Sequence, residues 1–169
     1  MKRLLLLSGL ISCILFTGCN NNEEYKDKME TALDKIELIC MLSSMKIYEI
    51  EYVWQTAIYD HEYNGRRCDN FEEALFDHNS KLRETDEYKS LMQDVEYLYQ
   101  MVEDLNKYPK KYKEAYNELI ELTTLVKEFV RMVKVPSGSL LTYSNEHKEL
   151  KSDIERRIDI MRLKYIGVK

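Results

Sequence analysis

Histidine is the residue type in this chain best suited to metal or proton chemistry, and the sequence contains three. His61, His78 and His147 all fall on the apolar side of a predicted helix, and each has an acidic neighbour. A ferritin-like di-metal bundle needs a Glu three residues before His. The residues at those positions are Ile58, Leu75 and Ser144. We therefore predict structural histidines, with no metal site and no cofactor.

The segment Ser137-Gly138-Ser139 contains a candidate nucleophile. It lacks the Gly-x-Ser-x-Gly elbow, and no predicted strand leads into it. A turn followed by a helix cap explains it better. Asp and Glu are abundant, but nothing in their spacing places two of them around a pocket. The sequence therefore predicts a protein that is not an enzyme.

The N-terminus has the pattern of an export signal. Lys2 and Arg3 precede an apolar run over residues 4–16, and Thr17-Gly18-Cys19 follows. A basic start and an apolar run of this length are typical of a secretory signal. The run is too short to span a bilayer, which takes about 20 residues.

The segment Phe16-Thr17-Gly18-Cys19 resembles the bacterial lipobox, with Phe16 where Leu is usual. The resemblance implies that residues 1–18 are a lipoprotein signal peptide and that Cys19 carries the lipid. Residues 19–24 would then be a short tether, and residues 25–169 a helical domain outside the cytoplasm. Two or three acyl chains hold a protein stably on a membrane. We expect a lipid anchor in the cell membrane or the outer membrane.

The net charge bears on the kind of partner that the protein could bind. The formal net charge is −5, and removing Lys2 and Arg3 makes the chain more acidic, which disfavours a nucleic-acid partner.

Cys40 falls within a predicted helix and Cys68 in the turn that follows it. At about 1.5 Å per helical residue they would lie roughly 30 Å apart, too far for a disulfide.

Apolar residues recur at alternating steps of three and four, which is typical of a bundle or coiled-coil helix. The pattern predicts four helices, over residues 23–63, 69–108, 109–135 and 140–165, and no strand. Asn64 and Gly65 favour a turn between the first two helices. The phase of the second helix slips within residues 83–88, so we expect a kink there, with Thr85 or Asp86 capping its second part.

Helix lengths predict the overall shape. The first two helices would be about 55 Å long and the last two about 38 Å. We therefore expect an all-α, elongated antiparallel bundle of four helices. Its first two helices would protrude as a two-helix coiled-coil hairpin, a stalk over roughly residues 50–82.

Parts of the second half resemble a helical hairpin found in small uncharacterised lipoproteins, chiefly of Gram-positive bacteria. The resemblance is carried by Lys107-Tyr108-Pro109, by residues 112–116 and by residues 136–140. It implies no activity.

Aromatic residues gather on the predicted stalk. Because Tyr and Trp are favoured interface anchors, we interpret them as a recognition surface for a protein partner or a second copy. The alternative is that neighbouring helices bury them. The five residues are Tyr52, Trp54, Tyr59, Phe71 and Phe76.

Together these features favour an anchored extracytoplasmic lipoprotein that acts as a binding or spacer module. Two alternatives use the same binding chemistry, namely a phage- or competitor-exclusion lipoprotein and an accessory subunit of an envelope enzyme. The stalk is rich in acidic residues and the segment from His147 to Lys169 in basic ones. We interpret this uneven charge as that of ordinary solvated helix faces, and the alternative is that the basic segment contacts anionic lipid headgroups.

Overall fold

The computed structural model describes residues 17–167 and is almost entirely helical in that part of the chain, so the all-α prediction is confirmed. There are five α-helices where four were predicted. The elements are α1 (Thr17–Tyr59), β1 (Glu62–Tyr63), β2 (Arg66–Arg67), α2 (Phe71–Glu84), α3 (Asp86–Asp104), α4 (Lys113–Lys134) and α5 (Leu140–Met161), with short helical turns at η1 (Lys110–Tyr112) and η2 (Arg162–Ile166).

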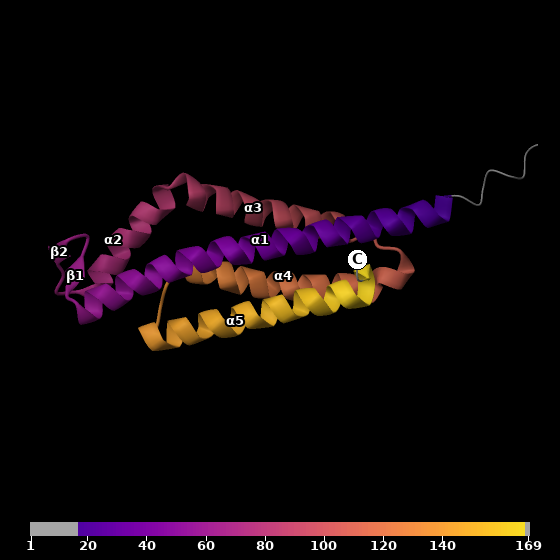
Figure 1. Cartoon of the computed structure of the whole chain (residues 1–169). Coiled ribbons are helices and arrows are strands. Elements are labelled where there is room, and N and C mark those ends of the chain that lie inside the picture. The colour runs from indigo at the N-terminus through magenta and orange to yellow at the C-terminus, as the bar shows by residue number, and fades with distance from the viewer. Residues whose placement is uncertain (1–16, 168–169) are drawn as a thin grey trace, which may run out of the picture.

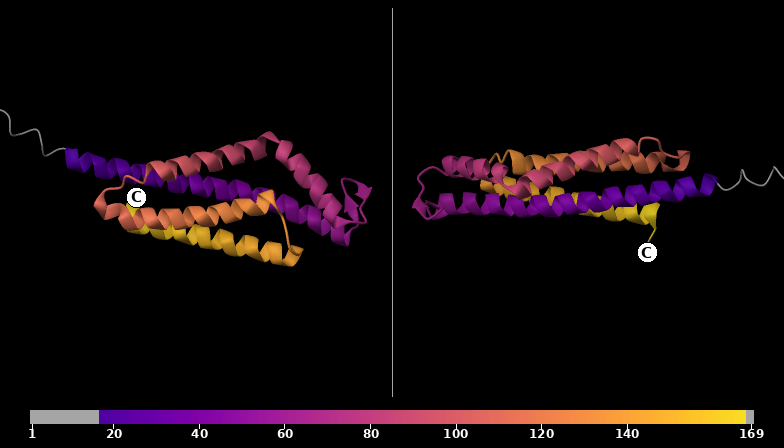
Figure 2. Two further views of the ribbon diagram at one scale, coloured as in Figure 1. Left: turned by 180° about the vertical axis from the view of Figure 1, so that it is seen from behind. Right: turned by 90° about the horizontal axis from the view of Figure 1, so that it is seen from above.

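The long helix α1 is the centre of the fold and packs against all four other α-helices. In Figure 1, α2 and α3 form a bent arm along one side of α1, and α4 and α5 lie along the other. Figure 2 shows the same arrangement from behind and from above, with α1, α3, α4 and α5 running close to one long axis and α2 tilted away from it in the view from behind. The molecule is therefore elongated along α1.

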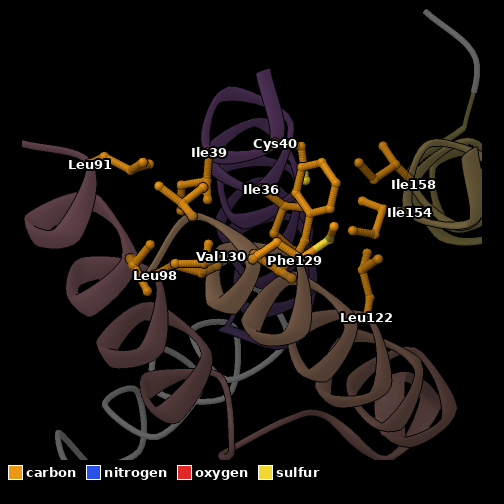
Figure 3. Close-up of a cluster of buried hydrophobic side chains, with 14 of the residues drawn as sticks. Ile36, Ile39, Cys40, Leu91, Leu98, Leu122, Phe129, Val130, Ile154 and Ile158 are labelled. Carbon is orange, nitrogen blue, oxygen red and sulfur yellow. The ribbon is translucent and has the colours of Figure 1, made fainter. Parts of the chain in front are cut away.

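The apolar residues of α1 predicted to face inward are buried from Met29 to Ala57. Ala32, Ile39 and Val53 are also buried, although they lie outside that predicted row, because α1 has neighbours on several sides. In Figure 3, Ile39 lies on the side of α3 and Cys40 on the side of α5. Burying one such aliphatic side chain contributes about 1.5 to 3 kcal/mol.

The break predicted within residues 83–88 separates α2 from α3. Thr85 has an extended backbone between the two helices. Its hydroxyl accepts a hydrogen bond from the Tyr88 amide at 3.2 Å and donates one to the Leu82 carbonyl at 2.7 Å. Thr85 therefore stops one helix and caps the next, and the expected restart cap is confirmed.

The connection after α1 differs from the prediction. The helix ends at Tyr59 rather than at residue 63, and β1 pairs with β2 in a small hairpin. Asn64 and Gly65 have φ angles of 51° and 72°, the positive values that such a tight turn requires. The Cys68 amide also donates to the His61 carbonyl at 2.7 Å. This turn chemistry favours strand pairing over about one more turn of helix.

The first turns of α1 include the residues assigned to a tether. α1 begins at Thr17, so residues 19–24 are helical and continuous with the rest of α1. The Tyr112 hydroxyl donates to the Asn22 carbonyl at 3.4 Å, and the Tyr25 hydroxyl donates to the Leu105 carbonyl at 3.0 Å. The junction between α3 and α4 thus supports this end of α1. Residues 1–16, most of the expected signal peptide, lie outside the described residues.

The connection between α4 and α5 is the turn and cap predicted around residues 137–139. Gly138 has a φ of 92°, and the Ser139 hydroxyl accepts from the Thr142 amide at 3.2 Å. α5 begins farther along α1 than α4 ends (Figure 1). Consequently Tyr143 of α5 contacts Trp54, so this part of the expected stalk is supported by α5.

Candidate functional site

Three of the five aromatic residues predicted as a recognition surface line one pocket. Trp54, Phe71 and Phe76 meet where α1, α2 and the connection between α4 and α5 come together. Tyr52 lies at a separate hollow beside the β hairpin, and Tyr59 is exposed at the end of α1. The predicted surface is therefore divided, and the pocket is its concave part.

The pocket is an open hollow of about 370 Å³. One wall is α2, the opposite wall is the chain from the end of α4 to the turn before α5, and Trp54 of α1 completes the lining. The lining residues are Trp54, Phe71, Glu72, Leu75, Phe76, Asn79, Ser80, Arg83, Lys134, Val135, Pro136, Ser137 and Gly138.

Ring packing holds the indole of Trp54 in place. The Phe71 ring lies nearly parallel to it, with ring centroids 6.2 Å apart and an interplanar angle of 17°. On its other side the Tyr143 ring lies at 5.5 Å, and the Tyr143 hydroxyl donates to the Met132 carbonyl at 3.0 Å. Burial raises the pKa of Tyr143, so this hydroxyl stays protonated and remains a donor. The aromatic lining is thus formed before any ligand binds.

Trp54 is buried, as the alternative interpretation of these aromatic residues expected. Only 2% of its surface is exposed, because Phe71 and Tyr143 cover it from two helices. Phe76, in contrast, is 76% exposed and Phe71 is 37% exposed. A partner would therefore meet Phe76 and the edge of Phe71, with Trp54 acting as support beneath them.

Polar groups at the pocket come from residues that the sequence analysis did not single out. The Arg83 guanidinium donates to the Lys134 carbonyl at 2.7 Å, which ties α2 to the end of α4. The side-chain oxygen of Asn79 is buried and has no hydrogen-bond partner in the described part of the chain. No local motif marks Asn79 or Arg83, since only the packing of α2 on the connection between α4 and α5 brings them here.

The three histidines lie in three different environments. His61 is exposed in the loop before β1, and not on the inner side of a helix as predicted. His78 is half-buried, and burial lowers its pKa. His147 is fully buried in α5. Within residues 17–167, no group of three or more His, Cys, Asp or Glu side chains comes together in a way that would hold a metal ion.

His147 lies beside Glu51 in a buried pair of titratable side chains. Its Nδ1 lies 3.3 Å from a carboxylate oxygen of Glu51, and the Tyr48 and Phe129 rings contact the imidazole at 4.8 and 5.6 Å. Burial lowers the pKa of His147, while Glu51 raises it and Lys148 and Lys151 lower it. Burial dominates, so the imidazole is neutral in the folded protein at neutral pH.

Stability is therefore expected to fall in mild acid because of His147. A pKa that is lowered by folding gives stability that is complete above the unfolded value, about 6.5, and is lost as the pH falls below it. We expect the Tm to fall between pH 7.5 and pH 5, and to fall less in the variant His147→Gln, which keeps a polar group for Glu51 but does not titrate. His78 is present in both proteins, so the difference reports His147. Equal pH slopes would contradict this role.

Basic residues near the C-terminus contact the chain's own carboxylates. Arg162 pairs with Asp34 and Glu37 at 2.6 and 2.9 Å, and Lys164 pairs with Glu118 at 2.8 Å. These ion pairs hold η2, at the end of α5, against α1 and α4. Part of the basic charge that the lipid-contact alternative requires is thus already matched within the chain.

Cys40 and Cys68 are both free. Cys40 is buried in α1, and burial raises its pKa to about 12, so its thiol stays protonated and unreactive. Cys68 is half-buried between β2 and α2.

No helix in the described part of the chain is long and apolar enough to cross a membrane. Comparison of the chain with protein families, curated proteins and solved structures finds no match. The pocket is therefore interpreted from its own geometry.

Proposed function

We propose that this protein is a lipid-anchored, extracytoplasmic binding module that holds a partner protein in the pocket around Phe71 and Phe76. The observation that carries the proposal is the convergence of two exposed aromatic side chains and a buried indole on one concave site. Interfaces use aromatic anchors of this kind, with a few polar groups that fix orientation.

The ligand that fits this site is an apolar or aromatic side chain of a partner protein. It would lie against Phe71 and Phe76, whose exposed rings line the hollow.

The position of the pocket suits an anchored protein. Cys19, the proposed lipid site, lies in the first turns of α1, and Trp54 lies near its other end. Some 35 helical residues between them correspond to roughly 50 Å. The lipid would hold one end of α1 at the membrane, and the pocket would be presented well away from it.

The proposed scaffold is an antiparallel four-helix bundle in which α2 and α3 together act as one bent helix. In Figure 1 the end of α1, the β hairpin and the start of α2 extend beyond α4 and α5. We propose that this end is the protruding hairpin that meets the partner. The pocket lies at its base, where α2 contacts the connection between α4 and α5.

Photo-crosslinking tests the binding role. A photoreactive amino acid at Ser80, which lines the pocket and is exposed, is expected to capture the partner on intact cells. Phe71→Ala with Phe76→Ala is expected to weaken capture strongly, because an aromatic anchor contributes on the order of 2 kcal/mol, about 30-fold in affinity. Tyr97→Ala, at an exposed tyrosine on α3, is the matched control and should leave capture unchanged. Equal capture by all three proteins would rule the pocket out.

A further inference from the structure

The outer face of α1 carries a second apolar row that the other described helices cover only in part, since Tyr48 also contacts His147 of α5. Large apolar side chains recur along it at alternating steps of three and four, interrupted only at Gln55. Each is between 37% and 70% exposed. The row, called here the outer stripe, consists of Leu38, Met41, Met45, Tyr48, Tyr52 and Tyr59.

This spacing is that of a coiled-coil seam. A row that keeps a period of 3.5 residues stays on one side of a helix and fits between the side chains of another helix. The inner row of α1 has the same period and is buried by the protein's own helices. The outer positions of such a helix ordinarily carry charged residues. The inner seam of α1 is therefore packed against the protein's own helices, whereas the outer seam is largely exposed.

The exposed area of the outer stripe suits a second copy of this chain. Six large side chains of about 200 Å² each, roughly half exposed, offer on the order of 600 to 700 Å². A stable complex buries about 800 Å² on each partner. In a two-fold dimer each copy contributes the same stripe to the interface. The exposed side chains of the stripe therefore supply most of the area that each copy must bury.

The charged side chains beside the outer stripe do not oppose the approach of a second copy of this chain. Glu37 pairs with Arg162 at 2.9 Å, and Glu49 pairs with Lys46 at 2.9 Å. On the α5 side, Lys151 pairs with Glu155 at 3.6 Å. With these charges matched within the chain, two copies approach without a large like-charge repulsion, and a strongly charged partner gains little.

We propose that the outer stripe of α1 is a dimerisation face, on which α1 of a second copy packs as a coiled coil. This interface is separate from the pocket around Phe76 and does not depend on the lipid anchor. Tyr52 and Tyr59, which lie outside that pocket, belong to the dimer interface.

Disulfide trapping tests the contact. Tyr48 lies at the middle of the stripe, so residue 48 faces its counterpart whether the two α1 helices run parallel or antiparallel. In the full chain carrying Cys68→Ser, oxidation with diamide in intact cells is expected to cross-link Tyr48→Cys at least tenfold more than Thr124→Cys. Thr124 is an exposed residue of α4 away from the stripe. Equal cross-linking of the two variants would overturn the proposal.

Sedimentation of the purified full chain measures its oligomeric state and tests whether the outer stripe holds two copies together. The wild type is expected to be a dimer, and Met45→Glu with Tyr52→Glu is expected to be a monomer of unchanged helicity, because both side chains are more than half exposed. A monomeric wild type, or a double variant that still dimerises, would overturn the proposal. Loss of helicity in the double variant would assign the stripe to the core and overturn it equally. Partner capture through Ser80 in the same double variant reports the pocket separately.

Discussion

Replacing Trp54 with alanine is expected to lower the free energy of unfolding by about 3 to 5 kcal/mol, the usual cost of removing a large aromatic side chain from a core. The indole is 2% exposed and packs between Phe71 of α2 and Tyr143 of α5. Its loss leaves a cavity where three helices meet. Denaturant unfolding followed by circular dichroism measures the change.

Tyr52→Ala is the matched control for Trp54→Ala. Tyr52 lies two residues away on the same helix and is 68% exposed. Its replacement is expected to change the free energy of unfolding of the monomer by no more than about 0.5 kcal/mol, as at most surface positions. If Trp54→Ala were no more costly than Tyr52→Ala, the burial of Trp54 between α2 and α5 would be refuted.

Cys19→Ala is expected to abolish fatty-acid labelling of the protein completely. The reason is chemical, since only the thiol of Cys19 in the lipobox-like segment can accept the lipid. The proposed acyl chains would contribute a membrane affinity of about 0.8 kcal/mol per buried methylene, which this variant would lack. Metabolic labelling with palmitate, followed by cell fractionation, measures both effects.

Cys68→Ala provides the control for the lipid prediction, because it removes a cysteine that is half-buried near the other end of α1. Its labelling and fractionation should match those of the wild type. Labelled, membrane-bound Cys19→Ala protein would show that the lipobox assignment is wrong, and the proposed anchored function would then have to be abandoned.

The inner sides of the helices could be read from the sequence alone. Apolar residues at steps of three and four mark Leu33, Ile36 and Ile47 in α1, and Leu119 and Phe129 in α4, and all are fully buried. The reason is geometric, because a helix that repeats every 3.6 residues brings such positions onto one side. Several helix ends could be read too. Thr85 and Ser139 cap helices because their hydroxyls accept hydrogen bonds from amides that a helix start leaves unpaired.

The β hairpin shows where local patterns were insufficient. The apolar spacing continued through His61, and it predicted helix as far as residue 63. Asn64 and Gly65 were correctly expected to take positive φ angles. The pairing of Glu62 with Arg67 and of Tyr63 with Arg66 then ended α1 earlier. Hydrogen bonding between two short strands competed with helix here, and apolar periodicity does not report that competition.

The residues that line the pocket, and the exposure of each, depend on tertiary packing. The sequence drew attention to Trp54, Phe71 and Phe76, but it did not distinguish the buried indole from the exposed Phe76 ring. That difference depends on α5, whose Tyr143 reaches Trp54. Asn79 and Arg83 became part of the site because α2 lies against the end of α4. Contacts between segments more than 50 residues apart leave no periodic trace in either segment.

The amino-acid sequence by itself determined that the chain is helical, which side of each helix faces inward, and where most helices stop, because these features follow from backbone geometry and hydrogen bonding within a few residues. Only the tertiary structure decided that α1 is the central helix, contacted by all the others. It also decided that the outer stripe of α1 remains exposed while Trp54 is covered. Each side chain's exposure depends on which helices pack beside it, and that choice is made by the whole fold.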